Sequence, residues 1–168
     1  MLCFAPMLKR LDSPLFDELA ARARSAARGR TNENLHAGPD DPVQRFLNAI
    51  EPGSYVCPHR HTQPPKWELF VALAGAALVL IFDEHGTVLG REQVAAAGPL
   101  RGLEIPPGVW HTIAALAPGT VLLELKPGPY QAISDKDFAP WAPREGAPAA
   151  AGFARWMVTA CIGERFAL

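Results

Sequence analysis

The N-terminal part of the chain carries apolar residues at helical spacing. They recur every three or four positions and so share one face of a helix: Leu15, Phe16, Leu19, Ala20 and Ala23. Ser13 and Pro14 supply an N-cap and a first helical residue, and Gly29 supplies a stop signal. The pattern predicts an amphipathic helix over residues 14–28, packed on the outside of the main body.

After Arg30 the chain changes to short apolar segments separated by clusters of Pro, Gly and Asp. Turn signals at roughly 8–15-residue intervals are typical of an antiparallel sandwich or barrel. Strands are predicted over Val43–Ile50, Ala76–Phe82 and Val121–Lys126. The run Leu69–Phe82 contains Gly75, which predicts two buried strands joined by a tight hairpin. We expect an all-β fold, a β-sandwich or jelly-roll barrel, with an N-terminal α-helix and a short C-terminal extension.

Three regions follow from these patterns. Residues 1–30 form the N-terminal segment with the helix, residues 31–146 the β-barrel domain, and residues 147–168 a C-terminal tail. The tail from Phe153 onward is compatible with a short helix packed on the body or on a partner, and also with partial disorder.

Composition narrows the class of protein. A chain of 168 residues with 49% apolar residues is long enough for one domain with a buried core. The net charge of -1 gives no electrostatic case for nucleic acid. The run Leu69–Phe82 is shorter than the roughly 20 residues of a membrane-spanning helix, and the basic residues follow the apolar start rather than precede it. Three cysteines without regular spacing (Cys3, Cys57 and Cys161) favour a reducing compartment, so we expect a cytoplasmic protein.

Histidines carry the candidate chemistry. Alternate residues of a strand face one way, so Tyr55, Cys57, His59 and His61 are predicted to project to one side. Glu68 opens the next predicted strand, and the turn at residues 106–108 leads to a further histidine.

The candidate metal ligands are three imidazoles and one carboxylate: His59, His61, Glu68 and His111. This mixture suits one divalent first-row transition metal ion, such as Fe, Mn, Ni, Co or Zn, better than a thiolate-rich structural zinc site or an all-oxygen calcium site. Four protein ligands on a six-coordinate ion leave two positions open for a reacting molecule.

The same residues resemble the two cupin motifs. Gly53, His59, His61, Glu68 and Gly75 match the first motif, and the second is matched by Pro106, Gly108 and His111. The interval from His61 to Glu68 is longer than in the motif, and Ala115 stands where the second motif has Asn.

A more extensive resemblance, over about residues 14–146, is to the WbuC family of cupin-fold metalloproteins. It is carried by Asn32, Asn34-Leu35-His36, Gln44-Arg45, Pro58-His-Arg-His, Lys66-Trp-Glu68, Trp110-His111, Glu124, Lys126, Tyr130, Asp135–Phe138 and Trp141-Ala-Pro. The resemblance implies a metal-binding cupin and a link to surface-polysaccharide metabolism, without an assigned reaction.

Other polar residues are candidates for the pocket. Glu124 and Lys126 share one face of a predicted strand, which either faces solvent, with Leu123 and Leu125 inside, or enters the barrel. In the second interpretation Glu124, Lys126 and Tyr130 are candidate catalytic groups. Candidate substrate-binding residues are Arg45, Gln44, His36, Lys66 and Tyr55.

Two main functional hypotheses remain at this point. The first is a metalloenzyme that acts on a small polar molecule, a sugar derivative or carboxylic acid, by isomerase- or lyase-type Lewis-acid chemistry or as a dioxygenase. The alternative is a non-catalytic metal-dependent binding or sensor module; a third hypothesis is a metal that only stabilises the barrel. We expect a small-molecule ligand, no nucleic-acid or membrane partner, and a homodimer.

Overall fold

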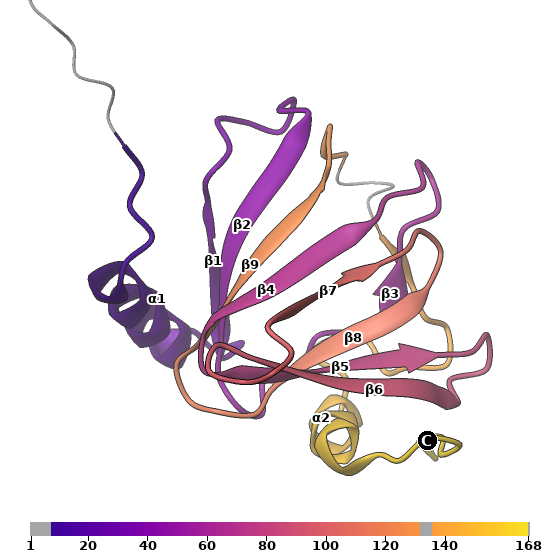
Figure 1. The fold of residues 1–168 in the computed structure, drawn as a ribbon. Helices are drawn as coiled ribbons and strands as arrows, with labels where there is room; N and C mark the ends of the chain where they lie inside the picture. Colours follow the sequence, from indigo (N-terminus) through magenta and orange to yellow (C-terminus); the bar gives the residue numbers. More distant parts are fainter. Residues whose placement is uncertain (1–7, 132–135, 168) are drawn as a thin grey trace, which may run out of the picture.

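The computed structural model describes residues 8–131 and 136–167, and Cys3 and Asp135 lie outside them. Within these residues two antiparallel five-stranded sheets face each other, with one helix on the outer side of each (Figure 1). In order of pairing, the first sheet contains β1 (Arg30–Asn34), β2 (Val43–Ile50), β9 (Thr120–Pro127), β4 (Glu68–Ala74) and β7 (Gly102–Ile105). The second contains β10 (Asp137–Phe138), β3 (His59–Arg60), β8 (Trp110–Ala115), β5 (Ala76–Phe82) and β6 (Val88–Ala95). The expected all-β sandwich with an N-terminal helix is confirmed.

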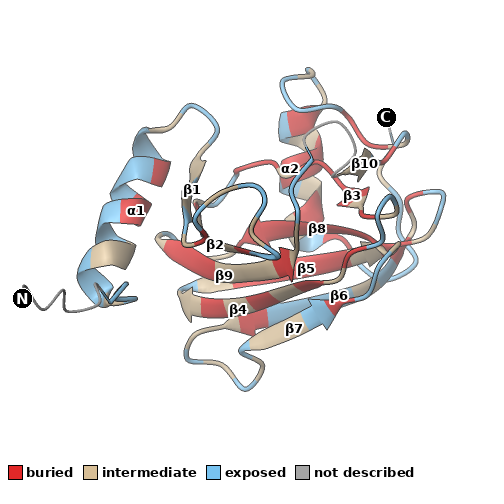
Figure 2. Ribbon diagram, turned by 90° about the horizontal axis from the view of Figure 1, so that it is seen from above, coloured by how far each residue is buried: buried red, intermediate tan, exposed pale blue. Residues whose placement is uncertain are grey.

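Helix α1 (Ser13–Ser25) starts and ends earlier than predicted. Asp12, rather than Ser13, is the N-cap, and its carboxylate accepts a hydrogen bond from the backbone N–H of Leu15 at 3.4 Å. The helix ends at Ser25, ahead of the predicted stop at Gly29. Its apolar face covers the outer side of the first sheet, while the opposite face is exposed (Figure 2).

The C-terminal region contains helix α2 (Ala150–Thr159), which packs on the outer side of the second sheet. Phe153 and Met157 are fully buried there, in one apolar cluster with Leu78 and Leu80 of β5. Of the alternatives for the tail, the structure therefore shows a helix packed on the body.

The inner faces of the sheets change character along each strand. At one end they are apolar, as at Ile113, Leu122 and Phe70, and these residues form the core between the sheets. On the same face of each strand, two residues closer to the other end of the sandwich, the side chains are polar. They are His111 on β8, Glu124 on β9 and Glu68 on β4. One end of the sandwich is therefore closed by hydrophobic packing, and the other is available for polar chemistry.

The predicted hairpin at Gly75 is wrong, although both flanking strands are correct. β4 belongs to the first sheet and β5 to the second, so Gly75 is a corner between sheets. Its φ is 65°, and a Cβ at this position would lie 2.5 Å from Oγ1 of Thr120. The chain switches sheets here because each strand finds its hydrogen-bonding partners in a different layer.

The strand expected around His59 is shorter than the alternation suggested. β3 contains only His59 and Arg60, and Tyr55 and Cys57 precede it in irregular chain. Both side chains are buried in the apolar cluster around Phe153, between the outer face of the second sheet and α2. Among the described residues, no helix has the length and apolar character that crossing a membrane requires.

Candidate metal centre

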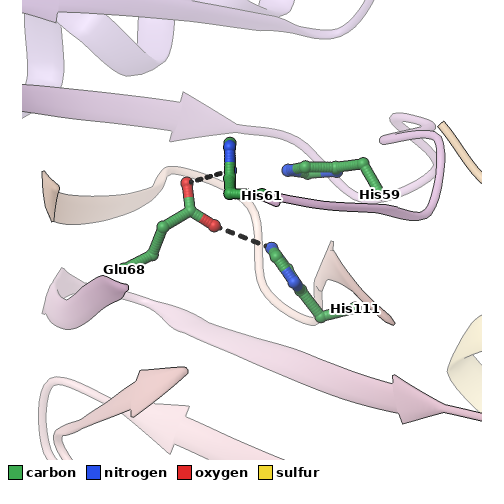
Figure 3. Close-up of side chains that lie close together, drawn as sticks. All are labelled: His59, His61, Glu68 and His111. Atoms are coloured by element: carbon green, nitrogen blue, oxygen red, sulfur yellow. Dashed lines mark ion pairs between the residues drawn. The ribbon is translucent and has the colours of Figure 1, made fainter. Parts of the chain in front are cut away.

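The four predicted ligands meet between the two sheets (Figure 3). His59 lies in β3 directly opposite His111 of β8, and His61 follows β3. Glu68 enters from the other sheet, as the first residue of β4. Residues far apart in the sequence are thus brought to one point by the pairing of β3 with β8 and by the facing of the two sheets.

The geometry of these four residues is compact. One potential ligand atom from each lies within 4.8 Å of all the others, and all four residues are buried. The carboxylate of Glu68 is shared, with Oε1 at 3.1 Å from Nε2 of His61 and Oε2 at 2.8 Å from Nε2 of His111. A single small cation fits between donors at this separation.

Backbone carbonyls orient two of the imidazoles. Nδ1 of His59 lies 3.0 Å from the carbonyl oxygen of Cys57, and Nδ1 of His111 lies 2.9 Å from that of Val109. Because a carbonyl oxygen only accepts hydrogen bonds, Nδ1 must carry the proton in both rings. The lone pair then resides on Nε2, the nitrogen that faces the centre in His111, which is how metal-bound histidines are commonly held.

Electrostatic interactions also favour the protonation states in which histidine and glutamate bind a metal, namely a neutral imidazole and an ionised carboxylate. Burial, together with the positive charge of Lys136, holds the pKa of His59 well below its usual value, so its imidazole is neutral at pH 7. Burial alone would raise the pKa of Glu68, but interactions with His111 and His61 hold it well below the usual value. Nε2 of His111 and Oε2 of Glu68 are buried, and within the part of the chain that the structure describes neither contacts a polar partner other than the 2.8 Å approach between them, which suits atoms that bind a cation. The residues present therefore fit a divalent transition metal ion.

Two adjoining cavities open beside this centre. The smaller has a volume of about 200 Å³ and is lined by His59 and Glu68, and the larger has a volume of about 770 Å³. Both are lined by the same five residues where they adjoin: Arg28, Asn32, Asn48, Glu124 and Lys136. The centre is thus accessible to a small molecule from the larger cavity.

Glu124 and Lys126 enter the barrel, which decides between the two orientations left open by the sequence. Both line the larger cavity, while Leu123 lies on the outer face. Nζ of Lys126 lies 3.7 Å from Oε1 of Glu68 and 3.5 Å from Oε1 of Glu124. A buried lysine therefore links the metal-site carboxylate to a second carboxylate.

The pKa of Glu124 is shifted in the opposite direction to that of Glu68. Its Oε2 accepts a hydrogen bond from Nδ2 of Asn48 at 2.6 Å. Burial, reinforced by the negative charge of Glu68, raises its pKa above the usual value despite the nearby Lys126. Glu124 therefore takes up a proton more readily than Glu68 does.

Three further candidates line the larger cavity: His36, Gln44 and Tyr130. Gln44 is buried, and its Nε2 donates to backbone carbonyls of Pro39 at 3.1 Å and Asp41 at 2.9 Å, so it holds the 38–41 loop in place. Tyr130 is 43% exposed and lies at the cavity mouth.

The remaining substrate-binding candidates lie elsewhere. Because successive strand residues alternate between faces, Arg45 points to the opposite face of β2 from Gln44. There its Nη2 pairs with Oδ2 of Asp41 at 3.0 Å. Nζ of the buried Lys66 donates to the carbonyl of Pro129 at 2.8 Å, and the hydroxyl of Tyr55 donates to that of Pro143 at 2.6 Å. None of these three residues lines either cavity.

Sequence reasoning missed several lining residues, including Arg28, Asn32, Phe46, Asn48 and Lys136. Alternation along β2 provides a signal for two of them, since Phe46 and Asn48 share the face of Gln44. Arg28 and Lys136 lie outside strands, so no periodicity indicates their position.

Comparison with solved structures shows the fold alone. CapF of Staphylococcus aureus, a capsular polysaccharide assembling protein, matches with a TM-score of 0.52 and 20% identity over 64% of this chain and 28% of that one. Oxalate decarboxylase of Bacillus subtilis at pH 4.6 matches with a TM-score of 0.50 and 20% identity over 65% and 27%. KdgF of Halomonas sp. matches with a TM-score of 0.48 and 16% identity over 62% and 82%. The match to CapF and the decarboxylase thus spans little more than a quarter of those chains, and it shows a shared cupin-like β-sandwich fold.

Comparison with sequence families is more specific. No curated protein matches the chain. The resemblance to the WbuC family remains a prediction. The model of one family, described as a domain of unknown function (DUF6016), matches residues 11–94, which is half of the chain and includes His59, His61 and Glu68. The chain belongs to the DUF6016 family.

Proposed function

We propose that this protein is a metal-dependent cupin that binds and transforms a small polar molecule, a sugar derivative or a carboxylic acid. One observation carries the proposal: four buried donors within 4.8 Å of one another lie beside a polar cavity that reaches two of them, His59 and Glu68. A metal that only stabilised the barrel would not need such access. His59, His61, Glu68 and His111 would hold one divalent transition metal ion.

The bound ion would act as a Lewis acid on substrate oxygens. The residues of the chain supply the rest. Lys126, with its Nζ 3.7 Å from Oε1 of Glu68, balances the charge of that carboxylate. Glu124 lines both cavities and has a raised pKa, so it would exchange a proton with the substrate, which is the role of a general acid or base. Tyr130, at the mouth, is placed to contact the distal part of the ligand.

Metal content tests the first part of the proposal. We expect the wild-type protein to retain about one equivalent of a divalent transition metal in elemental analysis. The double variant His59→Ala, Glu68→Ala should retain none, while His85→Ala, which removes an exposed imidazole in the β5–β6 turn, should bind as wild type does. Equal metal content in the double variant and the wild type would refute the site.

Proton exchange tests the chemistry. In D2O, metal-loaded protein incubated with a panel of sugar acids and hydroxy acids should incorporate deuterium at a carbon next to a carbonyl or carboxylate, detected by NMR. Glu124→Gln should abolish incorporation while metal content stays unchanged. Ligand binding without incorporation would favour the non-catalytic binding module, and oxygen consumption without incorporation would favour a dioxygenase.

We also propose a homodimer that works in the cytoplasm, in surface-polysaccharide metabolism. The resemblance to the WbuC family supports the metabolic role. Cys57 and Cys161, the cysteines that the structure describes, are both free, which supports a reducing compartment.

A further inference from the structure

We infer that the cavity takes a hydroxyl-rich carboxylate, a sugar acid, with its acidic group between Arg28 and Lys136 and its hydroxyls along β1 and β2. This inference rests on the proposed function, since it identifies the ligand of the same site. It joins two chemical classes that the proposed function leaves as alternatives, and it assigns a place to each group of the ligand.

The charge distribution indicates an acidic ligand. Four cationic residues line the two cavities, namely Arg28, Arg30, Lys126 and Lys136, against two carboxylates, Glu68 and Glu124. Glu145 also pairs with Arg28 and Arg30, with its Oε2 at 2.7 and 2.8 Å from their Nη2 atoms. With Glu124 counted as ionised, the charges of these seven residues still sum to plus one, and a divalent ion would add two more. A cavity with this excess attracts an anion.

Arg28 and Lys136 mark the position of the acidic group. They line both cavities, so they lie where the larger cavity meets the one that reaches the metal ligands. Glu145 engages Nε and Nη2 of Arg28, and among the residues that the structure describes Nη1 of the same guanidinium has no acceptor, so a ligand can supply one. A carboxylate held here lies next to the metal centre.

Asparagines on neighbouring strands provide the complement to hydroxyl groups. Asn32 and Asn34 lie on the cavity face of β1, and Asn48 lies opposite Asn32 on β2. Nδ2 of Asn32 donates to Oδ1 of Asn34 at 2.7 Å, and Nδ2 of Asn48 donates to Glu124. Within residues 8–131 and 136–167, Oδ1 of Asn32 and Nδ2 of Asn34 have no side-chain partner and are left as an acceptor and a donor. Hydroxyls both donate and accept, so they match this arrangement better than purely anionic or apolar groups do.

Phe46 supplies an apolar surface within this polar wall. It lies opposite Asn34 on β1 and opposite Glu124 on β9, and its ring is nearly perpendicular to that of His36 at a centroid distance of 4.9 Å. The C–H face of a sugar ring can pack on such a ring while its hydroxyls reach the flanking amides. The larger cavity, at about 770 Å³, has room for a ligand the size of a six-membered-ring sugar acid.

A matched set of three six-membered-ring compounds tests the inference by calorimetry on metal-loaded protein. D-glucuronate carries hydroxyls and a carboxylate, D-glucose lacks the carboxylate, and cyclohexanecarboxylate lacks the hydroxyls. We expect glucuronate to bind at least ten-fold more tightly than either of the others. Equal affinity for glucuronate and one of them, or no glucuronate binding at millimolar concentration, would overturn the inference.

Variants assign the two parts of the site. Lys136→Gln should weaken glucuronate binding about ten-fold and leave glucose unaffected. Asn34→Ala should weaken glucuronate severalfold and leave cyclohexanecarboxylate unaffected. Glu33→Gln, on the opposite face of β1 where Glu33 pairs with Arg22, is the control and should change neither affinity. Metal content is measured in parallel. If the protein binds metal but fails these tests, only the sugar-acid inference is refuted. If the protein binds no metal, the proposed function is refuted.

Discussion

Nζ of Lys126 lies 3.7 Å from Oε1 of Glu68, and both side chains are almost fully buried. The contact joins the metal-site carboxylate to the inner face of β9. The contact exists because β4 and β9 are antiparallel and Leu69 lies opposite Leu125. Glu68, which precedes Leu69, therefore lies beside Lys126, which follows Leu125. A lysine buried among carboxylates indicates a polar site rather than an ordinary core.

Replacing Lys126 with methionine should destabilise the metal-free protein by about 3–5 kcal/mol, because two buried carboxylates then lose their cation. Addition of a divalent metal should restore part of this loss, since the ion also balances Glu68. Urea denaturation with and without metal measures both effects. Lys9→Met, at an exposed position, is the control. A Lys126→Met protein as stable as wild type without metal would contradict the pairing.

Metal removal should lower stability. A ligand that binds only the folded state raises the free energy of unfolding by about 2.7 kcal/mol at a free concentration 100 times its Kd. Chelator treatment should therefore lower the Tm of the wild-type protein, and metal should restore it. Glu68→Gln should show little metal-dependent shift, because the amide is a weaker ligand than the carboxylate. Identical melting with metal and with chelator would argue against binding at this site.

The stability of the metal-free protein should fall as the pH drops below about 6.5. The pKa of His59 is well below its usual value in the folded state, so the unfolded chain takes up a proton that the folded chain excludes. Unfolding is then favoured as the pH falls, by about 1.4 kcal/mol per pH unit for one such histidine. His59→Gln should flatten the pH dependence between pH 5 and 6.5 in urea titrations. An unchanged slope would assign the effect to other groups.

The corner at Gly75 should tolerate no side chain. An alanine there would adopt a positive φ and bring its Cβ to 2.5 Å from Oγ1 of Thr120 and 2.9 Å from its Cα. We expect Gly75→Ala to cost about 3 kcal/mol, from backbone strain and overpacking together. Gly53 also has a positive φ, 86°, but has open space around it, so Gly53→Ala should cost only about 1–2 kcal/mol. Equal costs in thermal or urea unfolding would show that the contact with Thr120 is relieved.

Tyr55→Phe should affect stability rather than ligand binding. The substitution removes the buried hydrogen bond to the carbonyl of Pro143, at a cost of about 1–2 kcal/mol. Glucuronate affinity of the metal-loaded protein should stay unchanged, because Tyr55 lines neither cavity. A tenfold loss of affinity without loss of metal would instead support its predicted substrate-binding role.

Local sequence patterns were sufficient for much of the fold and for the metal centre. Alternating apolar residues between turn signals indicated most long strands, with β2 at the predicted residues Val43–Ile50. The ligand set was predictable because His59, His61 and Glu68 lie in one short motif and His111 follows a recognisable turn. These signals are local: each depends on a few neighbouring residues and their spacing.

Only the tertiary structure decided which strands pair and which faces meet. Gly75 has the same sequence signature in a hairpin as at a corner between sheets, because the choice depends on partners distant in the sequence. Alternation placed Glu124 and Lys126 on one face without showing whether that face was inside, and pairing of β9 between β2 and β4 put them against Glu68. Arg28 and Lys136 reach the cavity from irregular segments, where no periodicity predicts direction. The sequence by itself thus determined most strands and the candidate metal ligands. Tertiary packing alone determined the cavity beside them, since its walls are built from side chains that meet only when the two sheets face each other.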